Sequence, residues 1–203
     1  MRNKNSHAIN LLMLSSKMAD EDKGFPTHPF LVGEKVFLRP ATPEDIIDTH
    51  YWLTQSDPDS ISSHLSRLIS PNEAAEIYRR QEKTDMELTL MIIKKSDEEP
   101  VGVMSSSHFN PLNRSVEIDV LIDPQKRHKG LGKDALKILS KYLFLQRGLN
   151  KVFAQVGSFN APGIKLFDSA GFKKDGTLRD NHFYKGEFHN TLVYSLLRYE
   201  LDW

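Results

Sequence analysis

A strand, a basic loop with two glycines, and a helix follow one another between residues 115 and 147. Residues 115–123 alternate in polarity, and the four even positions from 116 to 122 carry β-branched residues, which predicts a strand with one buried face. Residues 132–147 space leucine and phenylalanine for one apolar helix face and end at Gly148, a residue type that caps helices in the left-handed conformation. This unit favours a sheet packed against helices.

The remaining sequence supplies further elements of both kinds. Strands are predicted at 36–39, 87–94, 101–109, 151–158 and 191–197, and helices at 42–55, 70–83 and 161–170. A few antiparallel strands followed by alternating strands and helices predict one α/β domain with a mixed sheet. Residues 1–33 are polar, then acidic, then bear proline and glycine, so we expect a partly flexible N-terminal extension before a domain over 34–203.

Composition excludes several classes of protein. The 203 residues contain 27 Lys+Arg and 27 Asp+Glu, and this balance argues against a globally basic nucleic-acid binder. The absence of cysteine excludes a thiol nucleophile and a disulfide, and it permits a cytoplasmic location. The apolar run at 8–14 is too short to span a bilayer, so no membrane association is expected. No metal-site spacing such as H-E-x-x-H occurs, so we expect no metal.

The loop over 123–133 is a candidate anion site. Gly130 and Gly132 allow close backbone approach at a helix start, where free N–H groups favour an anion. Between residues 124 and 137 lie five basic residues and one acid, and the alternative interpretation is a solvated, basic helix entry. The spacing fits neither a Walker loop, which lacks its first glycine here, nor a dinucleotide fingerprint, in which the strand turns directly into the glycines.

Two sequence blocks resemble the GCN5-related N-acetyltransferase (GNAT) superfamily. The first is Arg127-x-x-Gly130-x-Gly132 after a strand, and the second runs from Ser158-Phe159-Asn160-Ala161 to Ala170-Gly171-Phe172. The segment 176–179 is similar to the RimJ/RimL-like branch. The resemblance covers roughly residues 34–200. It implies a single GNAT-like domain with a central mixed, mostly antiparallel twisted sheet of six to seven strands, flanked by about four helices.

The resemblance also implies a co-substrate, acetyl-CoA, and the residues that hold it. The end of the strand would offer backbone groups to the pantetheine arm and the thioester carbonyl, the loop would wrap the pyrophosphate, and one asparagine would touch the pantetheine or orient the acceptor. In this chain the corresponding residues are Val120, Leu121, Ile122, Arg127, His128, Lys129, Gly130, Leu131, Gly132, Lys133 and Asn160.

Two residues are candidates for proton transfer. Many relatives carry a glutamate on the strand before the pyrophosphate loop, and Glu117 occupies that position; the alternative is a carboxylate that only positions the amine or a water. Some relatives place an acid after the Leu-Arg segment, where His182 falls, and histidine suits proton transfer near neutral pH. The family's frequent general-acid tyrosine corresponds to Phe167, which cannot donate a proton, while Tyr184 is an alternative donor.

Three functions follow. The first is an acetyl-CoA-dependent N-acetyltransferase, in which a primary amine of a protein N-terminus or a small molecule attacks the thioester directly. The second is a catalytically idle acyl-CoA-binding or sensing domain, and the third is a nucleotide-binding interaction module. The acidic loop 56–68, with Asp57 and Asp59, is a candidate acceptor site for a cationic amine. The terminal strand at 192–197 could present an edge for a homodimer.

Overall fold

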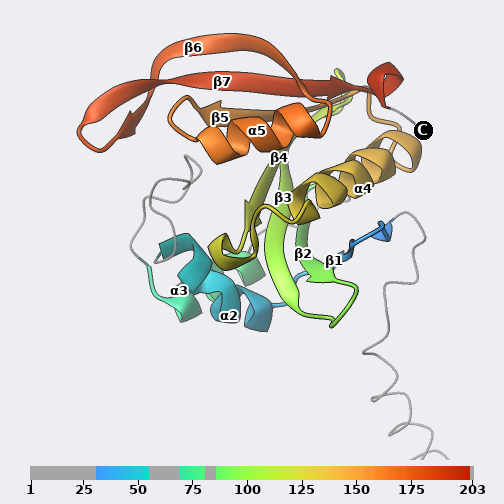
Figure 1. Ribbon diagram of the computed structural model, residues 1–203, viewed down its shortest axis with the longest axis vertical. Helices are drawn as coiled ribbons and strands as arrows, with labels where there is room; N and C mark the ends of the chain where they lie inside the picture. Colours follow the sequence, from blue (N-terminus) through green and yellow to red (C-terminus); the bar gives the residue numbers. More distant parts are fainter. Residues whose placement is uncertain (1–30, 55–68, 81–85, 202–203) are drawn as a thin grey trace, which may run out of the picture.

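The computed structural model of the chain describes residues 31–54, 69–80 and 86–201. They form a seven-stranded sheet in the order β1-β2-β3-β4-β5-β7-β6, with four α-helices packed on it (Figure 1). The single α/β domain with a mixed sheet is therefore confirmed. The elements are β1 Val36–Pro40, α2 Pro43–Thr54, α3 Pro71–Arg80, β2 Thr89–Lys94, β3 Pro100–Asn110, β4 Ser115–Ile122, α4 Leu131–Leu145, β5 Lys151–Gly157, α5 Ala161–Ser169, β6 Lys173–Tyr184 and β7 Glu187–Leu197.

Two apolar clusters lie on opposite faces of the sheet. The larger cluster contains the buried face of α4, including Leu136, Leu139 and Leu143, together with Val116 and Ile118 of β4. The smaller cluster joins α2 and α3 to β1 and β2, and Leu121 of β4 packs against it. Because successive strand residues point to opposite faces, the even positions of β4 face α4 and the odd positions face α2 and α3.

The C-terminal hairpin corrects the sequence-based interpretation. Strand β6 was not predicted, because both of its faces are largely exposed and it lacks apolar alternation. It pairs with β7, which begins at Glu187 rather than near residue 191, and β7 pairs on its other side with β5. The terminal strand is therefore internal, and the prediction that it presents a free edge for a homodimer is wrong. In the described sheet the edges are β1 and β6.

The segment that leads into β1 is attached to the start of α4. The Asp134 carboxylate accepts hydrogen bonds from the backbone N–H groups of Glu34, Lys35 and Val36 at 3.3, 2.8 and 3.0 Å. A Cβ at Gly33 would lie 2.6 Å from Asp134 Oδ2, so this close approach requires glycine. The predicted boundary at residue 33 thus lies next to residues that are hydrogen-bonded to α4. Residues 1–30 lie outside the described part of the chain.

The start of α2 is held to β1 by an ion pair and a helix cap. Arg39 donates to both carboxylate oxygens of Asp45 at 2.6 and 2.8 Å, and Thr42 and Asp45 cap one another's backbone N–H groups. Burial alone raises the pKa of the Asp45 carboxyl, but the hydrogen bonds from Arg39 and Thr42 outweigh it and lower the pKa below its ordinary value. A folded-state pKa below the unfolded one stabilises the protein above the unfolded pKa, and this stabilisation is lost as the pH falls through the folded value.

We expect Asp45→Asn to lower the free energy of unfolding by about 1–2 kcal/mol at pH 7, since it removes a charged hydrogen-bond acceptor and part of the cap. Denaturant unfolding should show this difference at neutral pH and a smaller one at about pH 3, below the ordinary carboxyl pKa of ~3.9. Asp48→Asn, on the exposed face of the same helix, is the matched control. An Asp45→Asn difference that grows on acidification would contradict the assignment.

Candidate active site

The sheet opens between its two parallel strands. The β4–β5 ladder covers only three residue pairs, from Ser115 with Lys151 to Glu117 with Phe153. Beyond that point β4 continues alongside β3, and β5 continues alongside β7. Within the described sheet, β4 and β5 share no further rung, so one backbone edge of β4 over residues 118–122 is left to other partners.

The loop after β4 ends in a helix start that no described side chain caps. Gly130 is the N-cap of α4 and adopts φ 77°, a left-handed conformation that favours glycine. The first N–H groups of a helix lack intrahelical partners, so those of Leu131, Gly132 and Lys133 are available to a ligand. A Cβ at Gly132 would lie only 3.2 Å from side-chain atoms of Ile122 and Leu166. The absence of a side chain at Gly132 therefore lets the helix start lie close to β4 and α5. This arrangement fits an anion.

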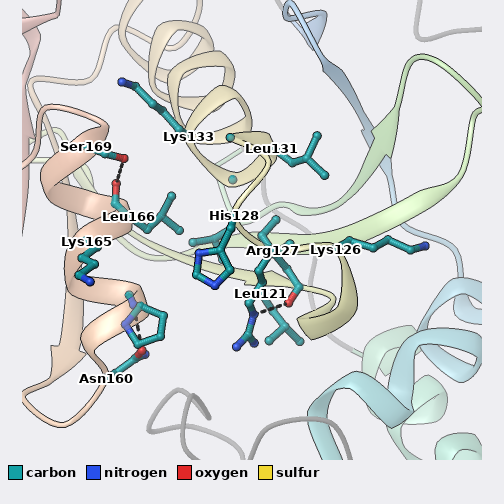
Figure 2. A pocket seen from close by; sticks show the side chains of 16 residues that line it. Leu121, Lys126, Arg127, His128, Leu131, Lys133, Asn160, Lys165, Leu166 and Ser169 are labelled. Carbon is teal, nitrogen blue, oxygen red and sulfur yellow. Dashed lines mark hydrogen bonds between the residues drawn. The ribbon is translucent and has the colours of Figure 1, made fainter.

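A pocket of about 280 Å³ lies between the end of β4, this loop, the start of α4 and one face of α5 (Figure 2). It brings together ten of the eleven residues that the family resemblance assigned to acetyl-CoA, and Lys129 is the one that does not line it. Figure 2 shows the His128 ring between α5 and Arg127, in the middle of the space. The lining residues are Val120, Leu121, Ile122, Lys126, Arg127, His128, Gly130, Leu131, Gly132, Lys133, Asn160, Pro162, Gly163, Lys165, Leu166 and Ser169.

The basic residues of the loop differ in what they contact. Arg127 Nε donates to the Ile122 carbonyl at 3.1 Å, which fixes the loop against the strand end. Lys126 pairs with Glu99 at 2.5 Å and points away from the pocket centre in Figure 2. Lys129 offers its carbonyl to Lys35 Nζ at 2.9 Å. The positive charge predicted from the sequence is thus partly used in internal contacts, while Lys133 is exposed at the pocket.

Asn160 begins α5 and also lines the pocket. Its Oδ1 accepts a hydrogen bond from Gly163 N at 2.9 Å, so the side chain caps the helix. A Cβ at Gly163 would lie 2.8 Å from Asn160 Nδ2, which explains the glycine there. The pocket-lining residues Pro162, Leu166 and Ser169 share one face of α5 at helical spacing. The sequence carries this spacing, but a core-facing helix has the same pattern, so these residues were not predicted.

Glu117 is buried at the closed end of the strand opening. Only 3% of the residue is exposed, and it forms the last rung that β4 shares with β5. Its Oε2 lies 3.1 Å from His108 Nδ1, while Oε1 is buried and has no hydrogen-bond partner among the residues that the structure describes. Val120, the first pocket-lining residue of β4, is three residues further along the strand, about 10 Å away.

His182 lies elsewhere on the sheet. It pairs with His189 of β7, and its ring contacts Phe159 edge-to-face at a centroid distance of 4.9 Å. Glu117 pairs with Phe153 of β5, which in turn pairs with Ser195 of β7. Ser195 is six residues from His189, the partner of His182, so Glu117 and His182 are separated by about 20 Å along the strand direction. The structure therefore does not bring the two candidates for proton transfer together. Tyr184 stacks on Phe159 in the same aromatic cluster.

Phe167, at the position of the family's tyrosine, is a core residue that packs on Phe172 and Tyr194. Of the two residues that pack on Phe167, only Tyr194 carries a phenol. Burial is the larger cause that raises the pKa of Tyr194 above its ordinary value, and the neighbouring Asp168 is the smaller cause. A phenol with a raised pKa is a weaker proton donor.

Other sequence predictions concern the acceptor side and metals. The acidic loop 56–68 with Asp57 and Asp59 lies outside the described residues. In the described ranges no group of His, Asp and Glu side chains is arranged to hold a metal ion. None of the helices described is both long enough and apolar enough to cross a membrane.

Comparison with known proteins identifies the family. The acetyltransferase (GNAT) domain matches residues 35–173. The chain is 27% identical over 174 residues to the SPbeta prophage-derived N-acetyltransferase YokL of Bacillus subtilis strain 168, covering 85% of this chain and 96% of the relative. It is 24% identical over 175 residues to the spermidine N(1)-acetyltransferase of Escherichia coli K12, covering 81% and 87%.

Solved structures agree on the fold. The spermidine N-acetyltransferase from Vibrio cholerae, in complex with CoA and spermine, superposes with a TM-score of 0.74 at 19% identity and covers 82% of this chain and 98% of that one. An opened mixed sheet with an uncapped helix start at the opening thus has the architecture of an acyltransferase. The chain belongs to the GNAT acetyltransferase family and is an N-acetyltransferase.

Proposed function

We propose that the chain uses acetyl-CoA as donor and acetylates a primary amine by direct attack on the thioester. The observation that carries this proposal is the placement of Glu117 at the closed end of the opening between β4 and β5, a buried carboxylate whose Oε1 has no hydrogen-bond partner among the described residues. The pocket supports the donor. No described side chain caps the N–H groups of Leu131–Lys133, which suit the pyrophosphate, and the edge of β4 that pairs with no described strand beyond Glu117 suits the pantetheine amides.

The chemistry needs one base and no covalent enzyme intermediate. An ammonium gives one proton to Glu117, and the neutral amine nitrogen forms a bond to the thioester carbon. The carbon–sulfur bond then breaks, and the nitrogen loses its second proton to solvent. The departing thiolate takes its proton from solvent, since Phe167 cannot donate one and a thiolate is a stable leaving group. A backbone N–H of β4 would stabilise the oxyanion that forms on the carbonyl.

For the acceptor, we propose a small cationic amine rather than a protein N-terminus. The E. coli and V. cholerae relatives are spermidine acetyltransferases by name. In this chain Glu117 and Asp119 lie on the face of β4 toward α2 and α3, and two neighbouring carboxylates favour a cation. The RimJ/RimL-like branch remains part of the proposal and is supported by residues 176–179.

Free-thiol release from acetyl-CoA tests the activity, with spermidine and an alanine-led peptide as acceptors and a no-amine control. We expect turnover with spermidine above both the peptide and the control. Binding of acetyl-CoA by calorimetry without thiol release for either amine would instead support the idle acyl-CoA-binding domain. Protection from thermal unfolding by ATP as strong as that by CoA would favour a nucleotide-binding module.

The separation of His182 from Glu117 gives a further prediction. We expect His182→Ala to lower kcat by no more than about threefold, because a group ~20 Å away along the sheet cannot exchange a proton directly with Glu117. Steady-state kinetics with spermidine measures this, and His189→Ala on the paired position of β7 controls for disturbance of the aromatic cluster. A loss above tenfold for His182→Ala alone would support its catalytic role.

A further inference from the structure

Strand β3 contains a bulge opposite Glu117. Between the pairs Ser107 with Glu117 and Asn110 with Ser115, β3 advances by three residues and β4 by two, so β3 carries one extra residue. In a regular strand His108 would point to the face opposite Ser107 and Glu117. His108 instead adopts φ 53°, a conformation uncommon outside glycine and tolerated best by Asn, Asp and His. The bulge therefore turns the His108 side chain toward the face that carries Glu117.

The redirected imidazole lies against one oxygen of the buried carboxylate. His108 Nδ1 lies 3.1 Å from Glu117 Oε2 and 3.2 Å from Ser107 Oγ. The His108 side chain is 66% exposed and that of Glu117 only 4%, so the imidazole connects a buried carboxylate with the surface. Among the described residues, Glu117 Oε1 has no hydrogen-bond partner. One carboxylate oxygen thus lies beside the imidazole, and the other is buried with no hydrogen-bond partner among those residues.

We propose that His108 is a positioning residue for Glu117, which rests on the function proposed above. In this role the Nδ1–H group donates to Oε2 and fixes the plane of the carboxylate, so that Oε1 is the oxygen left to receive the proton of the acceptor amine. A hydrogen bond to a charged acceptor is stronger than a neutral one and fixes both atoms, which a base at the end of a closed opening needs. The strained backbone at His108 is retained because the contact requires it.

Three substitutions at His108 separate the hydrogen bond from the fold. Asparagine tolerates the same φ, and its Nδ2 is as many bonds from the backbone as histidine Nδ1, so His108→Asn keeps a donor. Aspartate tolerates the same φ but places a carboxylate against Glu117. His108→Gly removes the side chain and relieves the left-handed backbone. Arg114→Gly, at φ 49° in the turn of the same hairpin, is the matched control for that relief.

With spermidine as acceptor, we expect His108→Gly to lower kcat by about 10- to 100-fold without changing KM for acetyl-CoA, because one hydrogen bond to a charged group is lost. The kcat of His108→Asp should fall at least as far as that of His108→Gly. The kcat of His108→Asn should stay within about threefold of the wild-type value, and the kcat of Arg114→Gly should equal the wild-type value. Equal activity of the Asn and Asp variants, or a wild-type kcat for His108→Gly, would overturn the proposal while leaving the acetyltransferase activity intact.

A measurement on the wild type alone makes the test independent of turnover. Nitrogen-15 NMR at about pH 8, where an ordinary imidazole is neutral, reports which ring nitrogen carries the proton. We expect the Nδ1–H tautomer for His108. An Nδ1 without a proton would overturn the positioning role, whether or not spermidine is acetylated. If NMR shows the Nδ1–H tautomer but no amine gives thiol release, the proposed acetyltransferase function is refuted. The His108–Glu117 contact then has no catalytic purpose.

Discussion

Glu117→Gln should lower kcat for amine acetylation by about 10²- to 10⁴-fold, the usual effect of losing a general base. Glutamine has the same shape and fills the same buried space, but its amide cannot take a proton from the amine. The dissociation constant for acetyl-CoA should be unchanged, because Glu117 does not line the pocket that the donor would occupy. Steady-state kinetics with spermidine and calorimetry with acetyl-CoA measure the two quantities separately.

Asp119→Asn is the informative comparison for Glu117→Gln. Asp119 lies two residues further along β4, on the same face, and is half-buried where Glu117 is buried. A larger kcat loss for Asp119→Asn than for Glu117→Gln would transfer the base assignment to Asp119. Equal weakening of acetyl-CoA binding by both variants would show that these carboxylates shape the donor pocket instead.

Gly130→Ala should weaken acetyl-CoA binding by at least about tenfold. A side chain at φ 77° costs about 1–2 kcal/mol, whereas the flexible Lys35 side chain can move away from the new Cβ, which would lie 2.9 Å from its Nζ. Relief of this strain moves the start of α4, and the N–H groups of Leu131–Lys133 then lose their alignment with the pyrophosphate. Calorimetry with acetyl-CoA measures the affinity, and thermal unfolding measures the stability.

Gly148→Ala controls for the backbone strain of Gly130→Ala. Gly148 follows the other end of α4 at φ 67°, and a Cβ there meets no atom within 4 Å. Both variants should lose comparable stability, but only Gly130→Ala should lose affinity. If Gly148→Ala weakens acetyl-CoA binding as much, the effect comes from general destabilisation, and the loop is not the pyrophosphate site.

The fold could be predicted where short-range patterns determine it. The α4 face with Leu136, Leu139 and Leu143 is buried as its spacing indicated, and the Gly130 and Gly132 positions mark the helix start. Strand β6 could not be predicted, because an exposed edge strand such as Lys173–Tyr184 buries neither face and leaves no periodic signal. The error about the sheet edge at β7 follows directly from this omission.

The pocket was predictable in the loop that lines it but not in the long-range contacts near it. The motif around Arg127 to Gly132 is continuous in the sequence, so its residues could be assigned together. The His108–Glu117 contact depends on a bulge, and a single extra residue in a strand changes no residue type that could be recognised in advance. The use of Asp134 to bind three backbone N–H groups is equally invisible, because it joins residues about a hundred positions apart.

The short β4–β5 ladder has a mechanical consequence. Three residue pairs between these strands connect a four-strand half of the sheet with a three-strand half, and α4 contacts both halves. A molecule whose amides bond to β4 while its other groups touch α5 would act as a substitute strand that cross-links the two halves. The midpoint temperature of unfolding should then rise with the concentration of that molecule, because a ligand that binds only the folded state shifts the folding equilibrium by mass action.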